Sequence, residues 1–362
     1  MLAKREHAKN LPPLLVEVLK QADMFKTDSE NIYDISYISK RWQEIEKIVS
    51  REKGLYEGLK KALDKIKKPG IDVIAVTSGP GLAPALWVGI SFANALGKLW
   101  DIPVIGINHM EGHIASVLMS KTEEFSISNF QFSKNSNAIQ FPALALLISG
   151  GHTELVDIQG WGKYKIIGQT LDDAVGEAFD KAARMMGLPY PGGPQISSMA
   201  EKADKENLER KVKLPRPMIH SSDLNFSFSG LKTAVLYHIR DYGLLSENDK
   251  ADLAREFEEA VTDVLLNKTK KALKEVGAKT LIIAGGVISN KKLRSVFSKL
   301  EKEYLDLKIR FPSRGLSTDN SVMIAYAGYI NVYLYPKLLS FSEKILAEGN
   351  LKLKSCPQPG EK

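Results

Sequence analysis

The sequence has little cysteine and no long hydrophobic run. Its single cysteine, Cys356, lies in a polar segment near the end of the 362 residues. A disulfide framework or a thiolate metal cluster is therefore excluded, so any metal must be bound by His, Asp or Glu. No window approaches the roughly 18 uninterrupted apolar residues of a transmembrane helix. The first residues, Met1 to Glu6, do not lead into the apolar core of a signal peptide. We therefore expect a cytoplasmic protein that does not associate with a membrane.

The composition indicates a globular protein with an anionic partner. Hydrophobic residues make up 44% of the chain, and its length is sufficient for two domains with separate cores. A net charge of +7 favours an anionic partner, either a polynucleotide or a small phosphate. A solvated lysine surface is the simpler alternative.

A pair of histidines stands out just beyond the apolar run Ile102 to Ile107. His109 and His113 are four residues apart, so on a helix they share one face and can bind a single metal ion. A helix zinc peptidase has Glu directly after its first His, whereas Glu111 comes two places after His109. This order disfavours a metallopeptidase. Two ordinary helix histidines are the alternative.

The hydrophobic pattern predicts two α/β regions. In the first, the predicted order is strand, helix, strand and the two-histidine helix; in the second it is a hairpin followed by helices and a buried strand. The predicted elements are strands 71–77 and 102–107 with helix 82–100 between them, a hairpin of 141–148 and 154–158, helices 176–187 and 253–276, strand 280–284 and helix 321–334. Ser289 or Asn290 can cap the helix after Gly286.

Six further motifs follow the histidine pair in order. They are Leu147 to Glu154, Asp172 to Lys181, Pro191 to Pro194, Phe226 to Thr233, Ala284 to Asn290 and Ser317 to Asn320. In this order and spacing the set, from about Ala3 to about Leu334, resembles the TsaD family, the tRNA N6-adenosine threonylcarbamoyltransferases. The resemblance implies an α/β protein with the two-lobed fold of the actin-like and sugar-kinase ATPase superfamily, with a nucleotide-type ligand in its cleft.

The resemblance also sets the expected domains. We expect a first α/β lobe at 1–140, a second at 141–318, and at 319–362 a C-terminal helix that returns to the first lobe, followed by a polar tail. Family members open with strands and an Asp-Glu-Thr-like loop, whereas this chain starts at a later segment, so a first lobe truncated at its N-terminus is expected. Residues 23–68 look like an inserted helical hairpin packed on this lobe, with partner binding as the alternative. Polar residues 120–140 are predicted to form a surface loop.

The resemblance implies which residues form the site. Asp319 occupies the place of the third metal ligand beside His109 and His113, and two His with one carboxylate suit Fe(II), although zinc also binds such a set. A simple helix cap is the alternative for Asp319. The implied substrate contacts are Leu147, Ile148, Ser149, Gly150, Gly151, Asp180, Gly193 and Asn290.

Other residues have two competing interpretations. Asp180 would accept hydrogen bonds from ribose, or would pair with Lys181 and Arg184 on a helix surface. Asn290 can both donate to and accept from the nucleotide. Glycine pairs 150–151, 192–193 and 285–286 are either simple turns or loops through which backbone amides approach a ligand.

Glu111 would either steady a metal-bound His or face solvent. His152 would carry a proton or be structural. The basic loop of Lys211, Lys213 and Arg216 would contact phosphates, or would simply be solvated.

The predicted reaction is transfer of a threonylcarbamoyl group from threonylcarbamoyl-AMP to N6 of the adenosine 3′ of the anticodon, in tRNAs reading ANN codons. No Ser or Cys nucleophile is evident, and none is required if positioning and charge stabilisation dominate. The resemblance further implies TsaB-like and TsaE-like helper proteins. The alternatives are a metallopeptidase and a non-catalytic nucleotide-binding scaffold.

Overall fold

The computed structural model describes residues 2–26, 35–63, 66–119, 139–313, 315–340 and 344–353. The chain divides into two compact units. Unit 1 is Met1–Gly112 with Ser321–Lys352, and unit 2 is His113–Asn320 with Leu353–Lys362. The sequence-based boundaries were placed after residues 140 and 318, and most of the predicted surface loop lies outside the described residues. Among the described helices, none has the length and apolar character needed to cross a membrane.

Unit 1 is built on two parallel strands. Its helices and strands are α1 (Leu2–Gln21), α2 (Ile35–Ile48), α3 (Leu55–Leu63), β1 (Ile74–Gly79), α4 (Ala83–Trp100), β2 (Val104–Asn108), the start of α5 (His109–Ala115), α12 (Ser321–Leu334) and the 3-10 turn η4 (Pro336–Leu339). β1 pairs with β2 in parallel, and α4 forms the crossover between them. The predicted strand-helix-strand-helix order is confirmed, with β1 starting three residues later than expected.

The segment that interrupts the first lobe contains two of the predicted helices, α2 and α3. Their apolar stripes supply Trp42, Ile45, Leu55 and Leu59 to one buried cluster, which also contains Trp100 of α4. Each of these five side chains is at most 4% exposed. The apolar spacing of α2 and α3 is therefore explained by packing on α4.

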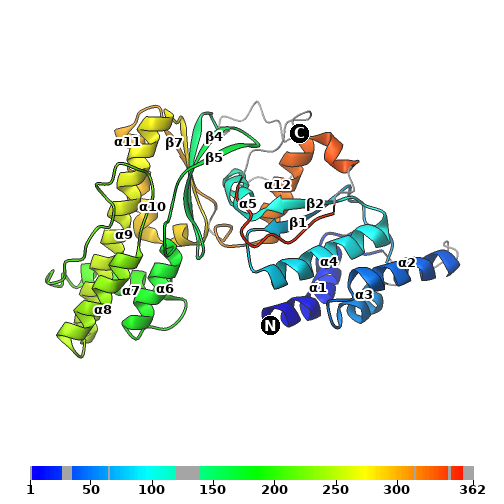
Figure 1. Ribbon diagram of the computed structural model, residues 1–362, viewed down its shortest axis with the longest axis horizontal. Helices are drawn as coiled ribbons and strands as arrows, with labels where there is room; N and C mark the ends of the chain where they lie inside the picture. The colour runs from blue at the N-terminus through cyan, green and yellow to red at the C-terminus, as the bar shows by residue number, and fades with distance from the viewer. Residues whose placement is uncertain are drawn as a thin grey trace. The chain divides into compact units, whose positions relative to one another are not determined.

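Unit 2 contains a mixed five-stranded sheet in the order β5-β4-β3-β6-β7. Its elements are η1 (Ser116–Leu118), β3 (Ala143–Ile148), β4 (Thr153–Gly160), β5 (Lys163–Gln169), α6 (Val175–Met185), α7 (Gly192–Lys205), α8 (Ser229–Tyr242), α9 (Glu247–Val276), β6 (Thr280–Ala284), η3 (Gly286–Ser289), α10 (Lys291–Ser298), α11 (Leu300–Glu303) and β7 (Lys308–Arg310). β3, β4 and β5 run antiparallel in sequence, which confirms the predicted hairpin, while β6 joins β3 in parallel. Helices α6 to α9 lie together on one side of this sheet (Figure 1).

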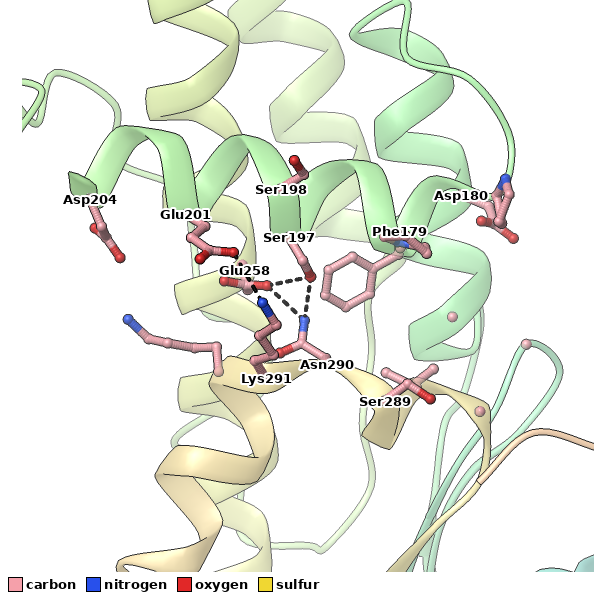
Figure 2. A pocket seen from close by; sticks show the side chains of 18 residues that line it. Phe179, Asp180, Ser197, Ser198, Glu201, Asp204, Glu258, Ser289, Asn290 and Lys291 are labelled. Carbon is pink, nitrogen blue, oxygen red and sulfur yellow. Dashed lines mark hydrogen bonds and ion pairs between the residues drawn. The ribbon is translucent and has the colours of Figure 1, made fainter. Parts of the chain in front are cut away.

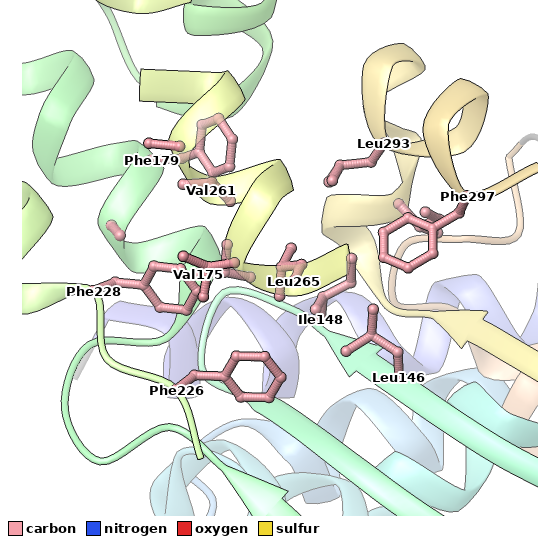
Figure 3. Packing of buried hydrophobic residues seen from close by; sticks show 14 of the residues in the cluster. Leu146, Ile148, Val175, Phe179, Phe226, Phe228, Val261, Leu265, Leu293 and Phe297 are labelled. Atoms are coloured by element: carbon pink, nitrogen blue, oxygen red, sulfur yellow. The ribbon is translucent and has the colours of Figure 1, made fainter. Parts of the chain in front are cut away.

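The core of unit 2 lies between the sheet and these helices. All six residues of β3 are buried, as expected for a strand covered on both faces. Alternate residues Leu146 and Ile148 face the helices, where they meet Leu265 of α9 and Phe226 (Figure 3). Burying an aliphatic or aromatic side chain of this size contributes about 1.5–3 kcal/mol, so this packing fixes the end of β3 firmly.

Candidate functional site

A pocket of about 760 Å³ opens in unit 2 beyond the ends of two neighbouring strands. β3 and β6 are parallel, with Leu147 opposite Ala284, so their carboxyl ends meet at the same edge of the sheet. Each strand runs directly into a glycine bend. Open α/β sheets bind ligands at this position, and the volume is typical of a pocket for a nucleotide-sized molecule.

The pocket wall comes from α6, α7, α9 and the turn before α10. Figure 2 shows the side chains that reach it. The lining residues are Gly150, Gly176, Phe179, Asp180, Pro191, Gly193, Pro194, Ser197, Ser198, Glu201, Asp204, Glu258, Gly286, Val287, Ser289, Asn290, Lys291 and Lys292. Of the eight predicted substrate contacts, the pocket brings together Gly150, Asp180, Gly193 and Asn290.

The other four predicted contacts lie beside the pocket. Leu147 and Ile148 are fully buried in β3, so only their backbone could meet a ligand. Ser149 and Gly151 flank Gly150 in the bend, where the Ser149 hydroxyl accepts from the backbone N–H of His152 at 3.1 Å.

In two of the three glycine pairs, the first and the second glycine have different structural roles. A Cβ at Gly192 would lie 2.7 Å from Ala183 Cβ, and one at Gly285 would lie 2.3 Å from the carbonyl oxygen of Ile148. At Gly193 and Gly286, by contrast, no heavy atom lies within 4 Å of such a Cβ. The first glycine of each pair therefore permits close packing, and the second leaves space in the pocket.

Asp180 is held by the backbone of α7. One carboxylate oxygen accepts a hydrogen bond of 2.7 Å from the N–H of Gly192. Lys181 forms ion pairs with Asp173 and Glu177. Within the described part of the chain, Asp180 forms no ion pair with Lys181 or Arg184, so the salt-bridge alternative is not found. The second carboxylate oxygen of Asp180 is left for the pocket.

Three polar side chains from different elements converge on one corner of the pocket. Oε1 of Glu258 in α9 accepts hydrogen bonds from Ser197 Oγ at 2.8 Å and from Asn290 Nδ2 at 2.6 Å. Asn290 Nδ2 also donates to Ser197 Oγ at 2.8 Å, while Oδ1 caps α10 by accepting from the N–H of Leu293. The predicted cap at Asn290 is confirmed. Sequence reasoning missed Ser197 and Glu258, which carry no local motif signal.

The histidine pair lies on one short helix, as predicted. His109 and His113 both belong to α5, and His113 Nε2 is 3.2 Å from Asp319 Oδ1. One ligand atom of each of these three residues lies within 4.8 Å of the others. Two ligands at about 2.1 Å from a common ion stand roughly 3–4 Å apart, so only a small adjustment would bring the three into coordination.

Glu111 does not face solvent. It is 5% exposed, and its Oε2 accepts a hydrogen bond of 3.1 Å from Nδ2 of Asn331 in α12. This excludes the solvent-facing interpretation. Glu111 joins α5 to α12.

The Phe226 to Thr233 motif is explained by Asp172. This carboxylate accepts hydrogen bonds from the backbone N–H groups of Phe228 and Ser229 and from the hydroxyls of Ser227 and Ser229. Burial acts to raise the pKa of Asp172, but these hydrogen bonds outweigh burial and lower it below the ordinary value of 3.8. Asp172 lies in the segment just before α6, and its negative charge is favourable at the N-terminus of α8.

Asp172→Asn is expected to destabilise the protein by about 1 kcal/mol at pH 7, because Asp172 is solvent-exposed and screening reduces the charge-assisted bonds. A lowered folded pKa stabilises the fold above the unfolded pKa, and this contribution is lost as the pH falls through the folded value. The difference from wild type should therefore stay constant down to about pH 4 and shrink below it. Urea unfolding across pH measures this, with exposed Asp306→Asn as the control; a difference that grows in acid would contradict it.

The basic loop before this motif is largely engaged by α9. Arg216 pairs with Glu256 and Asp263. Burial acts to lower the pKa of Arg216, but hydrogen bonds from its guanidinium to these two carboxylates raise it. Arg216 therefore anchors the loop on α9, which accounts for its charge without a phosphate.

Comparison with known proteins identifies similar sequences over most of the chain. The family model described as "TsaD: tRNA N6-adenosine threonylcarbamoyltransferase" matches residues 53–326. A tRNA N6-adenosine threonylcarbamoyltransferase of Paraburkholderia xenovorans (strain LB400) is 48% identical over 268 residues, which cover 74% of this chain and 72% of that protein. One of Burkholderia mallei (strain ATCC 23344) is 46% identical over 281 residues, covering 76% and 75%.

Two solved structures share the fold at low sequence identity. HypF of T. kodakarensis has a TM-score of 0.53 and 15% identity, over 80% of this chain and 45% of that one. A full-length HypF in its phosphate- and nucleotide-bound form has a TM-score of 0.51 and 13% identity, over 78% and 50%.

Proposed function

This chain belongs to the TsaD family of tRNA N6-adenosine threonylcarbamoyltransferases, and from this premise we propose the reaction that its pocket supports. It has the α/β fold of the actin-like and sugar-kinase superfamily and acts as an acyltransferase on tRNA. The acceptor is N6 of the adenosine 3′ of the anticodon, in tRNAs reading ANN codons. The observation that carries the proposal is the glycine-bordered pocket, which lies within the matched residues 53–326.

The proposed donor is threonylcarbamoyl-AMP, bound in this pocket. Gly150, Gly193 and Gly286 leave space for a phosphate to approach backbone N–H groups closely. The unbonded oxygen of Asp180 can accept from a ribose hydroxyl. The glycines and Asp180 would thus hold the AMP part and leave the acyl group to the incoming amine.

The transfer needs no covalent enzyme intermediate. The N6 amine attacks the carbamoyl carbon, a C–N bond forms, the C–O bond of the mixed anhydride breaks, and AMP leaves with the bonding electrons. The amine loses one proton in the same reaction. A rigid pocket holds the anhydride in a reactive orientation before the amine attacks. This lowers the activation free energy by up to about 7–11 kcal/mol, because less entropy is lost on reaching the transition state.

His109, His113 and Asp319 would bind one divalent metal ion. Two imidazoles and one carboxylate with open positions are the donor set that suits Fe(II), with zinc as the alternative. When bound, the ion supplies Lewis acidity toward a substrate oxygen. His113 is fully buried and therefore fixed in orientation, whereas Asp319 is exposed and can adjust. A metallopeptidase is disfavoured because Glu111 comes two places after His109 instead of directly after it.

We also propose that the protein works in the cytoplasm, where tRNA is modified, together with TsaB-like and TsaE-like helper proteins. The direct test supplies wild-type protein, these helpers, threonylcarbamoyl-AMP and unmodified tRNA, and measures modified adenosine by mass spectrometry of nucleosides. Modified adenosine is the expected result. Donor binding and helper binding without any transfer would instead support the non-catalytic scaffold.

Gly193→Val is expected to weaken AMP binding at least tenfold, because the new side chain occupies open pocket space. Asp180→Asn should weaken it about tenfold through the loss of a charged acceptor. Calorimetric titration with AMP measures both. The matched control is Gly70→Val, since Gly70 likewise has no heavy atom within 4 Å of its Cβ position but lies in unit 1, outside the pocket. Unchanged affinity in both pocket variants would place the donor elsewhere.

A further inference from the structure

The polar corner of the pocket leaves Asn290 with no hydrogen to give a ligand. Its amide nitrogen carries two hydrogens, and Nδ2 donates to both Glu258 and Ser197 (Figure 2). Its Oδ1 already caps α10 through Leu293. The sequence-based expectation that Asn290 donates to the nucleotide therefore conflicts with how the amide is used.

Glu258 is the group at this corner with unused capacity. Its Oε1 accepts from Ser197 and Asn290, while its Oε2 makes no hydrogen bond with any residue that the structure describes. The residue is only 6% exposed, yet it forms part of the pocket wall. Oε2 is not among the described side-chain atoms that are buried without a partner, so it is open to the pocket and a donor on a ligand can reach it.

We infer that Glu258 binds the nucleoside part of the donor, with Oε2 accepting a hydrogen bond from an amine or hydroxyl of AMP. This inference rests on the proposed function and adds a specificity-determining residue to it. Ser197 and Asn290 then position Glu258: they hold Oε1 and so turn Oε2 toward the ligand. The residue comes from the middle of α9, far in sequence from the glycine motifs.

Charge sets the direction in which the ligand binds. The carboxylates of Glu258, Glu201 and Asp204 lie on one part of the wall, and Figure 2 draws Asp180 well apart from them. Lys291 and Lys292 line the same part of the wall, but they pair with Glu201 and Glu259, so a phosphate is attracted more strongly by the backbone N–H groups at the glycines. The nucleoside therefore faces α7 and α9, and the phosphate faces the glycines.

The first experiment is calorimetric titration of AMP into wild-type protein and Glu258→Gln. Gln keeps the shape and an acceptor for Asn290 but presents N–H groups where the ligand also donates. AMP binding should weaken about 10- to 100-fold. Glu275→Gln is the matched control, because it makes the same chemical change at an exposed position of α9 that does not line the pocket. An unchanged affinity in Glu258→Gln overturns the inference.

A double-mutant cycle separates a contact from mere pocket shape. The 5′-monophosphate of purine riboside lacks the 6-amino group, while 2′-deoxy-AMP and 3′-deoxy-AMP each lack one hydroxyl. For the analogue that lacks the contacted group, wild type and Glu258→Gln should bind equally well, which identifies the donor. If Glu258→Gln weakens AMP and all three analogues by the same factor, Glu258 only shapes the pocket and the inference is wrong.

Two further measurements keep failure of the inference distinct from failure of the proposed function. Ser197→Ala leaves the carboxylate in place, so it should weaken AMP less than Glu258→Gln, and thermal unfolding checks that both variants fold. If wild-type protein binds no AMP, the proposed donor pocket is wrong and the inference falls with it. If AMP binds and Gly193→Val removes binding, but the cycle shows no coupling at Glu258, only the inference fails.

Discussion

His113→Ala is expected to lose its transition metal and to reduce threonylcarbamoyl transfer by more than 100-fold. Removing an outer partner of a metal ligand already weakens metal binding about 10- to 100-fold, so removing a ligand should weaken it further. His113 is fully buried, and its Nε2 lies 3.2 Å from Asp319 Oδ1. Elemental analysis of purified protein, with roughly one ion expected per wild-type chain, measures the loss.

The matched control for this prediction is His238→Ala. His238 also lies on a helix, α8, where its ring stacks on Tyr242 with centroids 5.1 Å apart. It is not part of the His109, His113 and Asp319 group. Metal content should be unchanged in this control and should fall in His109→Ala and Asp319→Ala. Full metal occupancy in His113→Ala would show that the assignment of His113 as a metal ligand is wrong.

Gly285→Ala is expected to destabilise unit 2 by about 3 kcal/mol or more. Gly285 has a φ of +101°, which an L side chain rarely adopts. The added methyl would also lie 2.3 Å from the Ile148 carbonyl oxygen, and a backbone carbonyl at the end of a buried strand cannot move aside cheaply. Urea unfolding followed by circular dichroism gives the free energy of unfolding.

Gly286→Ala separates stability from binding at the next position. No heavy atom lies within 4 Å of a Cβ there, so the free energy of unfolding should change by less than about 1 kcal/mol. Because Gly286 lines the pocket, AMP binding should nevertheless weaken. Equal destabilisation by the two substitutions would show that the packing account of Gly285 is wrong.

The local sequence pattern predicted many of the helices and strands, because these elements depend mainly on residues that are close together in the sequence. The apolar runs of β3 and β6 and the glycines after them are visible in the sequence, and the structure places both bends at the same edge of the sheet. The helical spacing of α2 and α3 likewise follows from the side chains they bury on α4. The observed strand ends differ from the predicted ones by a few residues, because hydrogen bonding to the neighbouring strand, and not composition, determines where a strand ends.

The pocket's polar corner could not be predicted in the same way. Glu258 sits in a helix rich in charge, and nothing near it in sequence separates it from Glu256 or Glu259, which hold Arg216 and Arg210. Only the packing of α7 against α9 turns Glu258 toward Ser197. For Asn290 the residue type was informative, but its hydrogen bonds depend on that same tertiary contact.

The uninterrupted length of helix α9 limits how the sequence of this protein can change in evolution. It runs for 30 residues without Gly or Pro, from a capping box at Ser246 to a left-handed Gly277. Along it, Glu258 faces the pocket, Glu256 holds the basic loop, and Lys268 donates to Ser221 Oγ at 2.6 Å. One inserted or deleted residue would rotate everything beyond it by about 100°. The helix can therefore accept many substitutions, but a change of even one residue in length would uncouple the pocket from the loop that leads into α8.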